Sequence, residues 1–589
     1  MTLLAVAPPA TAQAAGGVWT PLRVAPAVPK GSADLPRMAL EADGTAVAAW
    51  SENNSVRAAT RLPGSVFGVP RAIGSSQTLT VPDDAVAVGT RALVLLHAQQ
   101  GTGATLVASS VTGASVGGPE QAAATTAPIT EASAALRADA SALAVYAVAS
   151  SPMAISSAAR TPAGGWSPAG DLVLPPGVTL VQQLRLQPLP DGGAVLLVLG
   201  QGAAAVDVPR PYAAVRSAAG AWSALVPLDP GAVVACDDLG LAVDAAGNAY
   251  AAWSVADGRV RTSTRPAGGS FSVAAATAAT ARTPRVAAAP AGGGVLLAWI
   301  DVSGPPVLRS SEWTPAGLST AASTPLPAAA TTLESLALAD STAASAIVTE
   351  TTGSGAAQRF ATDVLERPAA ATPWAEQGVR TGLTESVGSP QLAMNALGAF
   401  AMWVEGSVVV ASGTDHGLPR VLALAKPRKV GVGVLGPFAV RASDTWSPIT
   451  DVTWLYGDGT SEHGPSVRHG YSRAGSFHVT VIVRDAAGNA AQRAFVVVAA
   501  PLATATSATA TTRGLSVGVR CLPSNPSVAG TLTAVIPGAR IVPFRCSVPG
   551  TGRALVPGAA RRGRHVVVRV TGVDLAGLPH PRASTLLTR

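Results

Sequence analysis

Few residues of this chain have the types and spacing that catalysis requires. The sequence contains seven histidines in 589 residues, and only His97 lies inside one of the hairpin repeats described below. His-x-x-x-His pairs, Glu-x-x-His pairs and phosphate-binding loops are missing, and no Gly-x-Ser-x-Gly sequence stands after a strand as a nucleophile elbow. His97 matches Trp50 and Tyr146 in repeat position, so we interpret it as a packed core residue. We therefore predict no metal, no cofactor and no catalytic residue.

Carboxylates recur in the chain, and carboxylate pairs would be the chemistry of a glycosidase. Glu41–Gly44, Asp191–Gly193 and Asp244–Gly247 each combine an acidic residue with a glycine between two apolar runs. Acidic residues at such positions form tight turns, and the Ser-x-Asp-x-Gly-x-x-Trp boxes of sialidases are absent. We predict a binding protein without catalysis; the alternative is a sialidase-like polysaccharide hydrolase or lyase. A binding face with clustered carboxylates and arginines would favour the enzyme, and one of Ala, Ser and Thr would favour binding.

Positive charge gathers near the C-terminal end. Residues 501–589 contain eleven arginines and a single acidic residue, Asp574. Clustered charge of one sign attracts polyanions, so we name candidate polyanion-binding residues: Arg561, Arg562, Arg564 and Arg569. The alternative is a solvated surface in an arginine-biased protein. The segment has no recognised nucleic-acid motif, so the expected partner is a polysaccharide, an anionic cell-wall polymer or a protein, and not nucleic acid.

Three cysteines are present. Cys521 and Cys546 each end an apolar run in the same C-terminal segment, and in an oxidising compartment they would form a disulfide. Two buried thiols are the alternative. Cys236 has no evident partner, and we interpret it as a small core residue.

Composition and the N-terminus predict a secreted, bacterial protein. Residues 1–15 end in Ala12-Gln13-Ala14, which is typical of the end of a signal peptide; the alternative is a disordered Ala-rich tail. Lysine is rare beside arginine, which fits a GC-rich coding sequence. Charged residues make up 13% of the chain, yet no apolar run is long enough for a transmembrane helix.

A repeat of about 50 residues fills the region 16–420, close to the size of one β-propeller blade. Each repeat has an apolar strand, a Gly-containing turn and a second apolar strand, as in residues 36–50, 239–253, 284–299 and 390–403. Third and fourth strands follow. We predict a β-propeller of about eight four-stranded blades, with seven blades or a string of small sandwiches as alternatives. Gly16–Pro21 resembles a missing fourth strand and should complete the last blade.

Aromatic residues end several of the second strands. Trp50, Trp253, Trp299 and Trp403 occupy this position. Large rings fill the space between twisted sheets, so we interpret them as packing residues between blades. A ring of sugar-stacking platforms is the alternative.

The segment from about 430 to 498 carries several motifs in order. They are Trp454-x-x-Gly457-Asp458-Gly459, His469-x-Tyr471, a strand that starts at Gly475, and the turn Asp485-x-x-Gly488. Together they resemble the PKD family. The resemblance implies an immunoglobulin-like β-sandwich of an extracellular protein, in which these residues are structural: the glycines allow the turn, Asp458 caps it, and Trp454 fills the core.

The whole chain is therefore predicted to be all-β. We expect a signal remnant at 1–15, a β-propeller at 16–420, a PKD domain at 425–500, a Thr/Ala-rich linker at 501–514 and a basic immunoglobulin-like sandwich at 515–589. Such a protein would act in extracellular adhesion or in recognition of carbohydrate or protein.

Overall fold

A computed structural model describes most of the chain from residue 20 onward. It leaves out residues 1–19, 25–32, 75–78, 203–206, 231–234, 280, 290, 291, 293, 340–342, 355–357, 368, 370, 371, 381–386, 406, 407, 522–528, 538, 539, 547–550 and 574–578. The predicted signal remnant therefore lies outside the described residues. All regular elements within those residues are β-strands. The described part holds no helix of the length and hydropathy needed to cross a membrane.

The chain divides into two compact units, with the boundary in the chain between Gly417 and Leu418. The described residues of the first unit form eight sheets. The first four sheets comprise β2 (Ala33–Leu40), β3 (Ala46–Glu52), β4 (Ser55–Arg61), β5 (Arg71–Ala72); β6 (Leu79–Val88), β7 (Arg91–Gln100), β8 (Gly103–Thr112), β9 (Ser115–Thr125); β10 (Ile129–Leu136), β11 (Ala142–Val148), β12 (Ala154–Arg160), β13 (Trp166–Leu172); and β14 (Val178–Pro188), β15 (Ala194–Gly202), β16 (Arg210–Arg216), β17 (Val226–Pro227).

The other four sheets continue in chain order. They comprise β18 (Cys236–Val243), β19 (Ala249–Val255), β20 (Arg259–Arg265), β21 (Ala275–Ala279); β22 (Ala281–Ala288), β23 (Val295–Asp301), β24 (Val307–Thr314), β25 (Gly317–Leu318), β26 (Ala322–Pro325); β27 (Ala330–Leu338), β28 (Ala344–Thr352), β29 (Arg359–Arg367), β30 (Ala375–Arg380); and β31 (Val387–Asn395), β32 (Gly398–Glu405), β33 (Val408–Asp415) with β1 (Thr20–Arg23).

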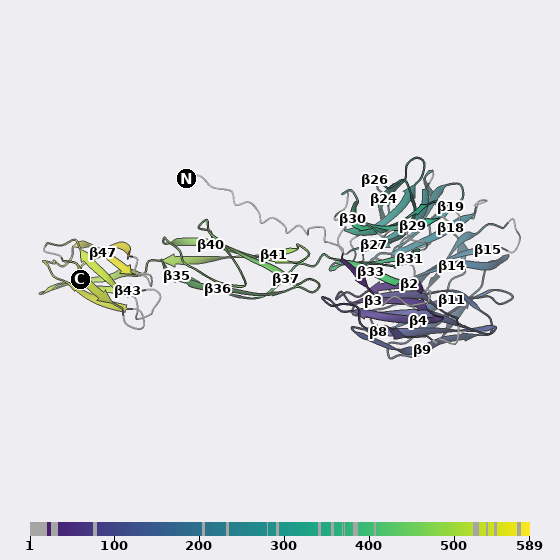
Figure 1. The fold of residues 1–589 in the computed structure, drawn as a ribbon, viewed down its shortest axis with the longest axis horizontal. Coiled ribbons are helices and arrows are strands. Elements are labelled where there is room, and N and C mark those ends of the chain that lie inside the picture. The colour runs from purple at the N-terminus through teal and green to yellow at the C-terminus, as the bar shows by residue number, and fades with distance from the viewer. Residues whose placement is uncertain are drawn as a thin grey trace. The chain divides into compact units, whose positions relative to one another are not determined.

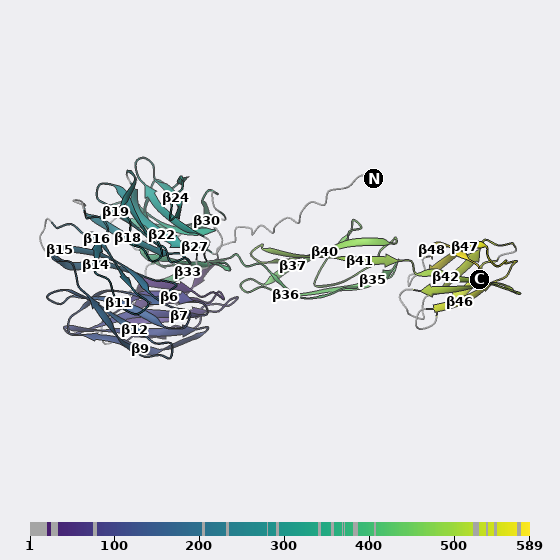
Figure 2. The ribbon, with the colours of Figure 1, turned by 180° about the vertical axis from the view of Figure 1, so that it is seen from behind.

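The eight sheets form a closed ring. The first strand of each sheet contacts the first strand of the next, and β2 of the first sheet contacts β31 of the last. Figure 1 shows the sheets following one another from purple to green, and Figure 2 shows them from behind. This arrangement is propeller-like, and a string of separate sandwiches would not bring β2 beside β31.

An N-terminal strand closes the ring, as the sequence predicted. β1 pairs with β33 in an antiparallel register, with Thr20 opposite Gly413 and Arg23 opposite Val410. It is the outer strand of the sheet that holds β31, β32 and β33. Backbone hydrogen bonds thus join segments from the two ends of the unit. They give the last sheet its fourth strand.

The tryptophans at the ends of the second strands are packing residues, as predicted. Trp50 and Trp253 have no exposed surface, and Trp299 and Trp403 are nearly buried. Trp253 packs in a cluster that also holds Leu197 of the preceding sheet. The rings fill the space between sheets and are not available to stack on sugars.

The second unit begins with a two-sheet sandwich. Its strands are β34 (Arg420–Ala425), β35 (Lys429–Gly431), β36 (Gly436–Ser443), β37 (Ile449–Leu455), β38 (Ser461–His463), β39 (Ser466–His469), β40 (Gly475–Asp485) and β41 (Ala490–Ala500). β34, β36 and β39 form one sheet, and the other five strands form the second. Trp454, Phe438 and Val481 lie in the core between them. β34 starts before residue 425, so the predicted start of this domain was too late.

A smaller pair of sheets follows. It comprises β42 (Ala503–Thr511), β43 (Gly514–Cys521), β44 (Ala529–Ala534), β45 (Val542–Arg545), β46 (Thr551–Val556), β47 (His565–Val573) and β48 (Pro579–Leu587). The predicted linker at 501–514 is wrong, because β42 pairs with β43 over nearly its whole length. Ala503, Ala505 and Ala508 are buried, so alanines fill the core while β-branched threonines favour the extended backbone. A disulfide joins Cys521 to Cys546, with their Cα atoms 6.2 Å apart.

Candidate ligand-binding channel

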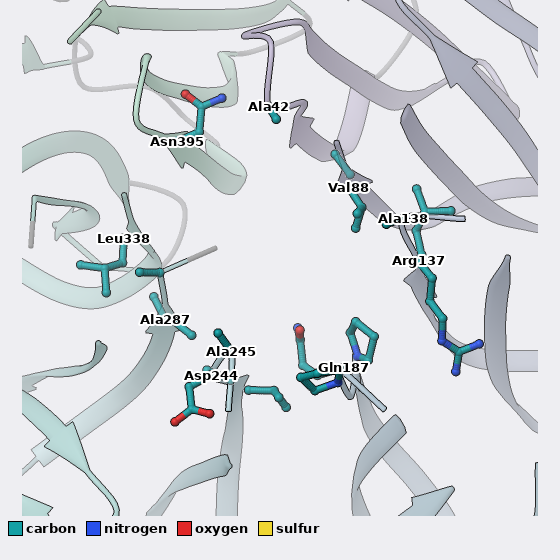
Figure 3. A pocket seen from close by; sticks show the side chains of 18 of the residues that line it. Ala42, Val88, Arg137, Ala138, Gln187, Asp244, Ala245, Ala287, Leu338 and Asn395 are labelled. Carbon is teal, nitrogen blue, oxygen red and sulfur yellow. The ribbon is translucent and has the colours of Figure 1, made fainter. Parts of the chain in front are cut away.

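A cavity of about 1100 Å³ opens at one end of the ring. All eight sheets contribute to its wall through the ends of their first strands and the turns that follow. Figure 3 shows these side chains arranged around an open centre, among them Ala42, Val88, Ala245 and Leu338. Alanine, leucine, valine and proline make up most of the wall, so this mouth of the channel is largely apolar.

The acidic residues at this mouth serve the turns, as the sequence predicted. Asp191 Oδ1 accepts a hydrogen bond from the Gly193 N–H at 2.7 Å. Asp244 Oδ1 accepts from two backbone N–H groups of its own turn, and its Oδ2 accepts from the Tyr250 hydroxyl at 2.9 Å. Their acceptor capacity is used within the hairpins, so they are not a catalytic carboxylate pair.

Charged side chains gather farther along the same strands. Every first strand has a register shift near its start, which marks a β-bulge or irregularity. Bulges change the direction of side chains and are common beside active sites. A polar or charged residue lies at or next to each shift, and we call this set the polar ring: Arg37, Asp84, Glu131, Gln183, Asp238, Arg285, Glu334 and Gln391.

Hydrogen bonds between neighbouring sheets tie the polar ring together. Asp84 Oδ2 accepts from the Ser133 hydroxyl and from the Ala134 N–H, both at 3.0 Å. Arg285 pairs with Asp238 through Nη1 and donates from Nε to the Glu334 carbonyl at 2.8 Å. These contacts give part of the ring a structural role, because they hold successive first strands side by side.

The charges of different sheets also act on one another across the channel. Burial raises the pKa of Glu131 to about 7. The charge of Arg185 opposes this rise, and the charge of Asp83 adds to it. Burial lowers the pKa of Arg185, helped by Arg285 two sheets away. Arg185 nevertheless keeps an exposed surface, as expected of a side chain that is enclosed by the ring and still faces the channel. Gln187, two residues along β14, lines the cavity.

His97 has a partner that the sequence analysis missed. It is 8% exposed, which agrees with its interpretation as a packed residue. Its Nδ1 lies 2.8 Å and 3.1 Å from the two carboxylate oxygens of Asp83. Asp83 lies within the irregularity of β6, and its backbone carbonyl accepts from Arg37 Nε at 2.7 Å. Burial raises the pKa of Asp83, and the hydrogen bond and charge of His97 oppose that rise.

The signal for the polar ring was present in the sequence. In the aligned repeats a polar residue stands directly before the apolar run, as in Pro36-Arg37-Met38 and Pro284-Arg285-Val286. The apolar residues and the turns of the repeats do not reveal this column, which appears only when the polar positions are aligned. The pairing of Asp83 with His97 could not be found in this way, because it depends on the bulge.

The motif residues of the sandwich at 420–500 form one connected cluster. Asp458 caps its turn by accepting from the Thr460 N–H at 3.0 Å, and its Oδ2 lies 2.9 Å from His469 Nε2. The Tyr456 ring stacks on His469 with centroids 3.7 Å apart. Tyr471 is fully buried and its hydroxyl points to the Tyr456 carbonyl.

The rest of this motif also has structural contacts. Trp454 is buried and donates to the Gly464 carbonyl at 2.9 Å. Asp485 accepts from the Asn489 N–H at 2.9 Å. Gly475 begins β40 against the ring of Phe477. These contacts support the structural roles that the sequence analysis gave to the motif.

The candidate polyanion-binding arginines are exposed but only partly gathered. Arg561, Arg562 and Arg564 lie in the turn before β47, where Thr588 binds the carbonyls of Arg561 and Arg564. Arg569 lies farther along β47, roughly 16–17 Å from Arg564 at the usual rise of a strand. Among the described residues of 501–589, no acidic side chain is present to neutralise them.

Comparison with known proteins identifies one domain. Residues 419–500 match the model of the PKD domain family, so the chain contains a PKD domain. No curated protein matches the chain.

Several solved structures are similar to this chain at low sequence identity. A lectin, BP39L from Burkholderia pseudomallei, is 14% identical, with 58% of this chain and 97% of that chain covered and a TM-score of 0.39. An ulvan lyase is 8% identical, with 69% of this chain and 95% of that chain covered and a TM-score of 0.37. An α-L-arabinanase from Penicillium chrysogenum is 10% identical, with 68% of this chain and 99% of that chain covered and a TM-score of 0.31. These similarities do not assign a function to this chain.

Proposed function

We propose that this chain is a secreted protein that recognises a polysaccharide through the channel of an eight-bladed β-propeller. The observation that carries this proposal is the polar ring: the first strand of each of the eight sheets, whose far end lines the cavity, carries one of these hydrogen-bonding residues at or next to its register shift. Arginine, carboxylate and amide groups offer fixed donors and acceptors, which suit a ligand rich in hydroxyl groups. The apolar mouth suits the carbon faces of sugar rings.

The second unit would space and attach the protein. PKD domains occur in extracellular proteins, and we propose that this one is an immunoglobulin-like spacer. The arginines at 561–564 would add salt-sensitive attraction to an anionic cell-wall polymer, because no described acidic side chain of this domain competes for them.

A second candidate function is polysaccharide cleavage. Clustered carboxylates and arginines in the channel are the feature that would favour an enzyme over a pure binding protein. Arg37, Asp83, Glu131 and Arg185 form such a cluster, since each of the other three acts on the pKa of Glu131. The apolar mouth favours binding alone, so the two candidates differ in what the deeper residues do.

Glycan-array binding of the full-length chain tests the proposal. Arg185→Ala should reduce channel binding at least tenfold, because Arg185 is an exposed cation of the channel. Replacement of Arg561, Arg562 and Arg564 by glutamine should instead remove only the salt-sensitive binding of anionic polymers. Arg513→Gln, an exposed arginine of the same domain, is the matched control. Binding that survives all of these changes would contradict both assignments.

A further inference from the structure

The wall of the channel where the first three sheets meet holds an acid–base cluster that binding alone does not require. β10 of the third sheet contacts β6 and β7 of the second. The hydrogen bonds from Ser133 and Ala134 to Asp84 hold β10 against β6. Glu131 lies two residues before Ser133, and Asp83 directly precedes Asp84. Both carboxylates therefore occupy the same stretch of wall.

His97 is oriented by this arrangement. Asp83 holds Nδ1 with both carboxylate oxygens, so Nδ1 carries the proton and Nε2 is left as the basic nitrogen. Within the described residues, no hydrogen bond to Nε2 is formed. A neutral imidazole whose second nitrogen is fixed by a carboxylate is a suitable general base near neutral pH.

Glu131 offers the complementary group. It is half-buried and has no side-chain hydrogen bond in the described structure. Its pKa of about 7 keeps a large share of it protonated near neutrality. Carboxyl groups with a raised pKa serve as general acids. Arg37 from the first sheet and Arg185 from the fourth are close enough for their positive charges to lower its pKa against the effect of burial.

We propose that His97, Glu131 and Arg185 form a catalytic site that cleaves a uronate-containing polysaccharide by β-elimination. His97 Nε2 removes the proton from the carbon that bears the carboxylate. The electrons of that C–H bond form a double bond to the adjacent carbon, whose C–O bond to the next sugar breaks. Glu131 donates its proton to the leaving oxygen. Arg185 pairs with the substrate carboxylate and stabilises the charge that develops on it. Exchange of protons with water restores both groups.

Elimination fits this cluster better than hydrolysis by two carboxylates. Hydrolysis would need a second ionised carboxylate that faces the substrate opposite the acid. Asp83 is committed to His97, and Asp84 is committed to Ser133 and Ala134. The base that remains is an imidazole, and the nearby arginines select an acidic substrate. The inference rests on the channel being the carbohydrate site that we propose above.

The test incubates the full-length protein with alginate, polygalacturonate, hyaluronan and chondroitin sulfate. Ultraviolet absorbance measures the new conjugated double bond, and calorimetry measures binding of the same polymers. We expect an unsaturated product from at least one of them. His97→Gln and Glu131→Gln should each reduce the rate about 100-fold or more, while Glu376→Gln, an exposed carboxylate on the outer strand β30, should leave it within a few-fold. Thermal unfolding checks that each variant is folded.

The outcomes separate this inference from the proposed function. Binding without an unsaturated product would overturn the catalytic assignment and leave the recognition site standing. New reducing ends without a double bond would also overturn cleavage by elimination and leave the recognition site standing. Neither binding nor cleavage with any polymer would overturn both. The pH profile adds a readout that a structural role would not move: the rate should fall as Glu131 ionises above pH 7, and Glu131→Gln should lose that dependence.

Discussion

Glu41 is a buried carboxylate in the turn between β2 and β3. It has no exposed surface, and no described residue gives either carboxylate oxygen a hydrogen bond of normal geometry. Burial and the charge of Asp43 raise its pKa from 4.5 to about 7, against a lowering effect of the Gly113 backbone. Between pH 4.5 and pH 7 the folded protein therefore keeps a proton that the unfolded chain has already lost. The stability that this proton supplies is lost as the pH rises through 7.

Glu41→Gln should remove this dependence. At pH 8 we expect the variant to be more stable than the wild type by about 1–3 kcal/mol, since one pKa unit corresponds to about 1.4 kcal/mol. Below pH 4.5 the difference should vanish. Thermal unfolding across this pH range measures it, and parallel curves for the two proteins would contradict the prediction.

The glycines of the PKD turn differ in what a side chain would meet. Gly457 has a φ of 76°, and a Cβ there would lie 2.4 Å from the His478 carbonyl oxygen. Gly459 has a φ of 95°, and a Cβ there would meet nothing within 4 Å. We expect Gly457→Ala to destabilise the domain by about 3 kcal/mol and Gly459→Ala, the matched control, by only about 1 kcal/mol. Chemical unfolding of the full chain measures both, and equal losses would show that the backbone angle alone matters.

At the scale of elements, the ring depends on strands that are distant in sequence. β1 supplies the outer strand of the sheet formed by β31, β32 and β33, and the Val24 N–H extends the pairing to the Val409 carbonyl at 3.1 Å. Loss of β1 would leave β33 as an unpaired edge and open the seam between the first and last sheets.

Removal of residues 1–24 should lower the midpoint of thermal unfolding of the ring by at least 5 °C. The expected cause is the loss of the backbone hydrogen bonds between β1 and β33. Removal of residues 1–15 alone is the control, since it ends before the predicted strand, and should change the midpoint by less than about 1 °C. If both truncations behave alike, β1 does not stabilise the ring.

Third strands carry a further feature that the repeat analysis overlooked. Arg61, Arg160, Arg216, Arg265 and Arg367 end the third strands of five sheets. Three of the described side chains reach the preceding sheet. Arg160 binds Glu120 through two hydrogen bonds, and Arg367 binds Glu312 at 2.7 Å. Arg61 lies over the Phe400 ring of the last sheet, 4.8 Å from its centroid. Ion pairs thus join some neighbouring sheets near their outer strands, while the polar ring joins them at the centre.

At the scale of the whole molecule, the two compact units should respond separately to reduction. The disulfide closes a loop with a sequence separation of 25 residues, inside the second unit. A loop of that length is worth about 3 kcal/mol in the chain-entropy model. Calorimetry of the full chain with and without reductant should show a lower midpoint for the basic domain and an unchanged midpoint for the ring.

Paired substitution of Cys521 and Cys546 by serine should reproduce the effect of the reductant. Cys236, which is buried and takes no part in the disulfide, provides the control: Cys236→Ala should leave the response to reductant intact. An oxidised protein whose thermogram does not change with reductant would mean that Cys521 and Cys546 act as two buried thiols.

The sequence determined the parts of this protein that depend on local pattern. Alternating apolar residues and Gly-containing turns fixed the hairpins, their repetition every fifty residues or so indicated a propeller-like ring, and the spacing from Trp454 to Asp485 identified the PKD domain. These features depend on backbone propensity and burial, which neighbouring residues decide. The Thr/Ala-rich segment at 503–511 misled the analysis, because the composition of a linker also suits a strand whose small side chains face a core.

The tertiary structure alone decided which side chains meet in the channel. Asp83 and His97 belong to neighbouring strands whose register is shifted by an irregularity, and Glu131 and Arg185 come from the next two sheets. Closure of the ring brings these groups from separate repeats to a common wall, where burial and mutual charge set their protonation. A linear pattern cannot report this, because the distance between two residues across a closed ring does not depend on their separation along the chain.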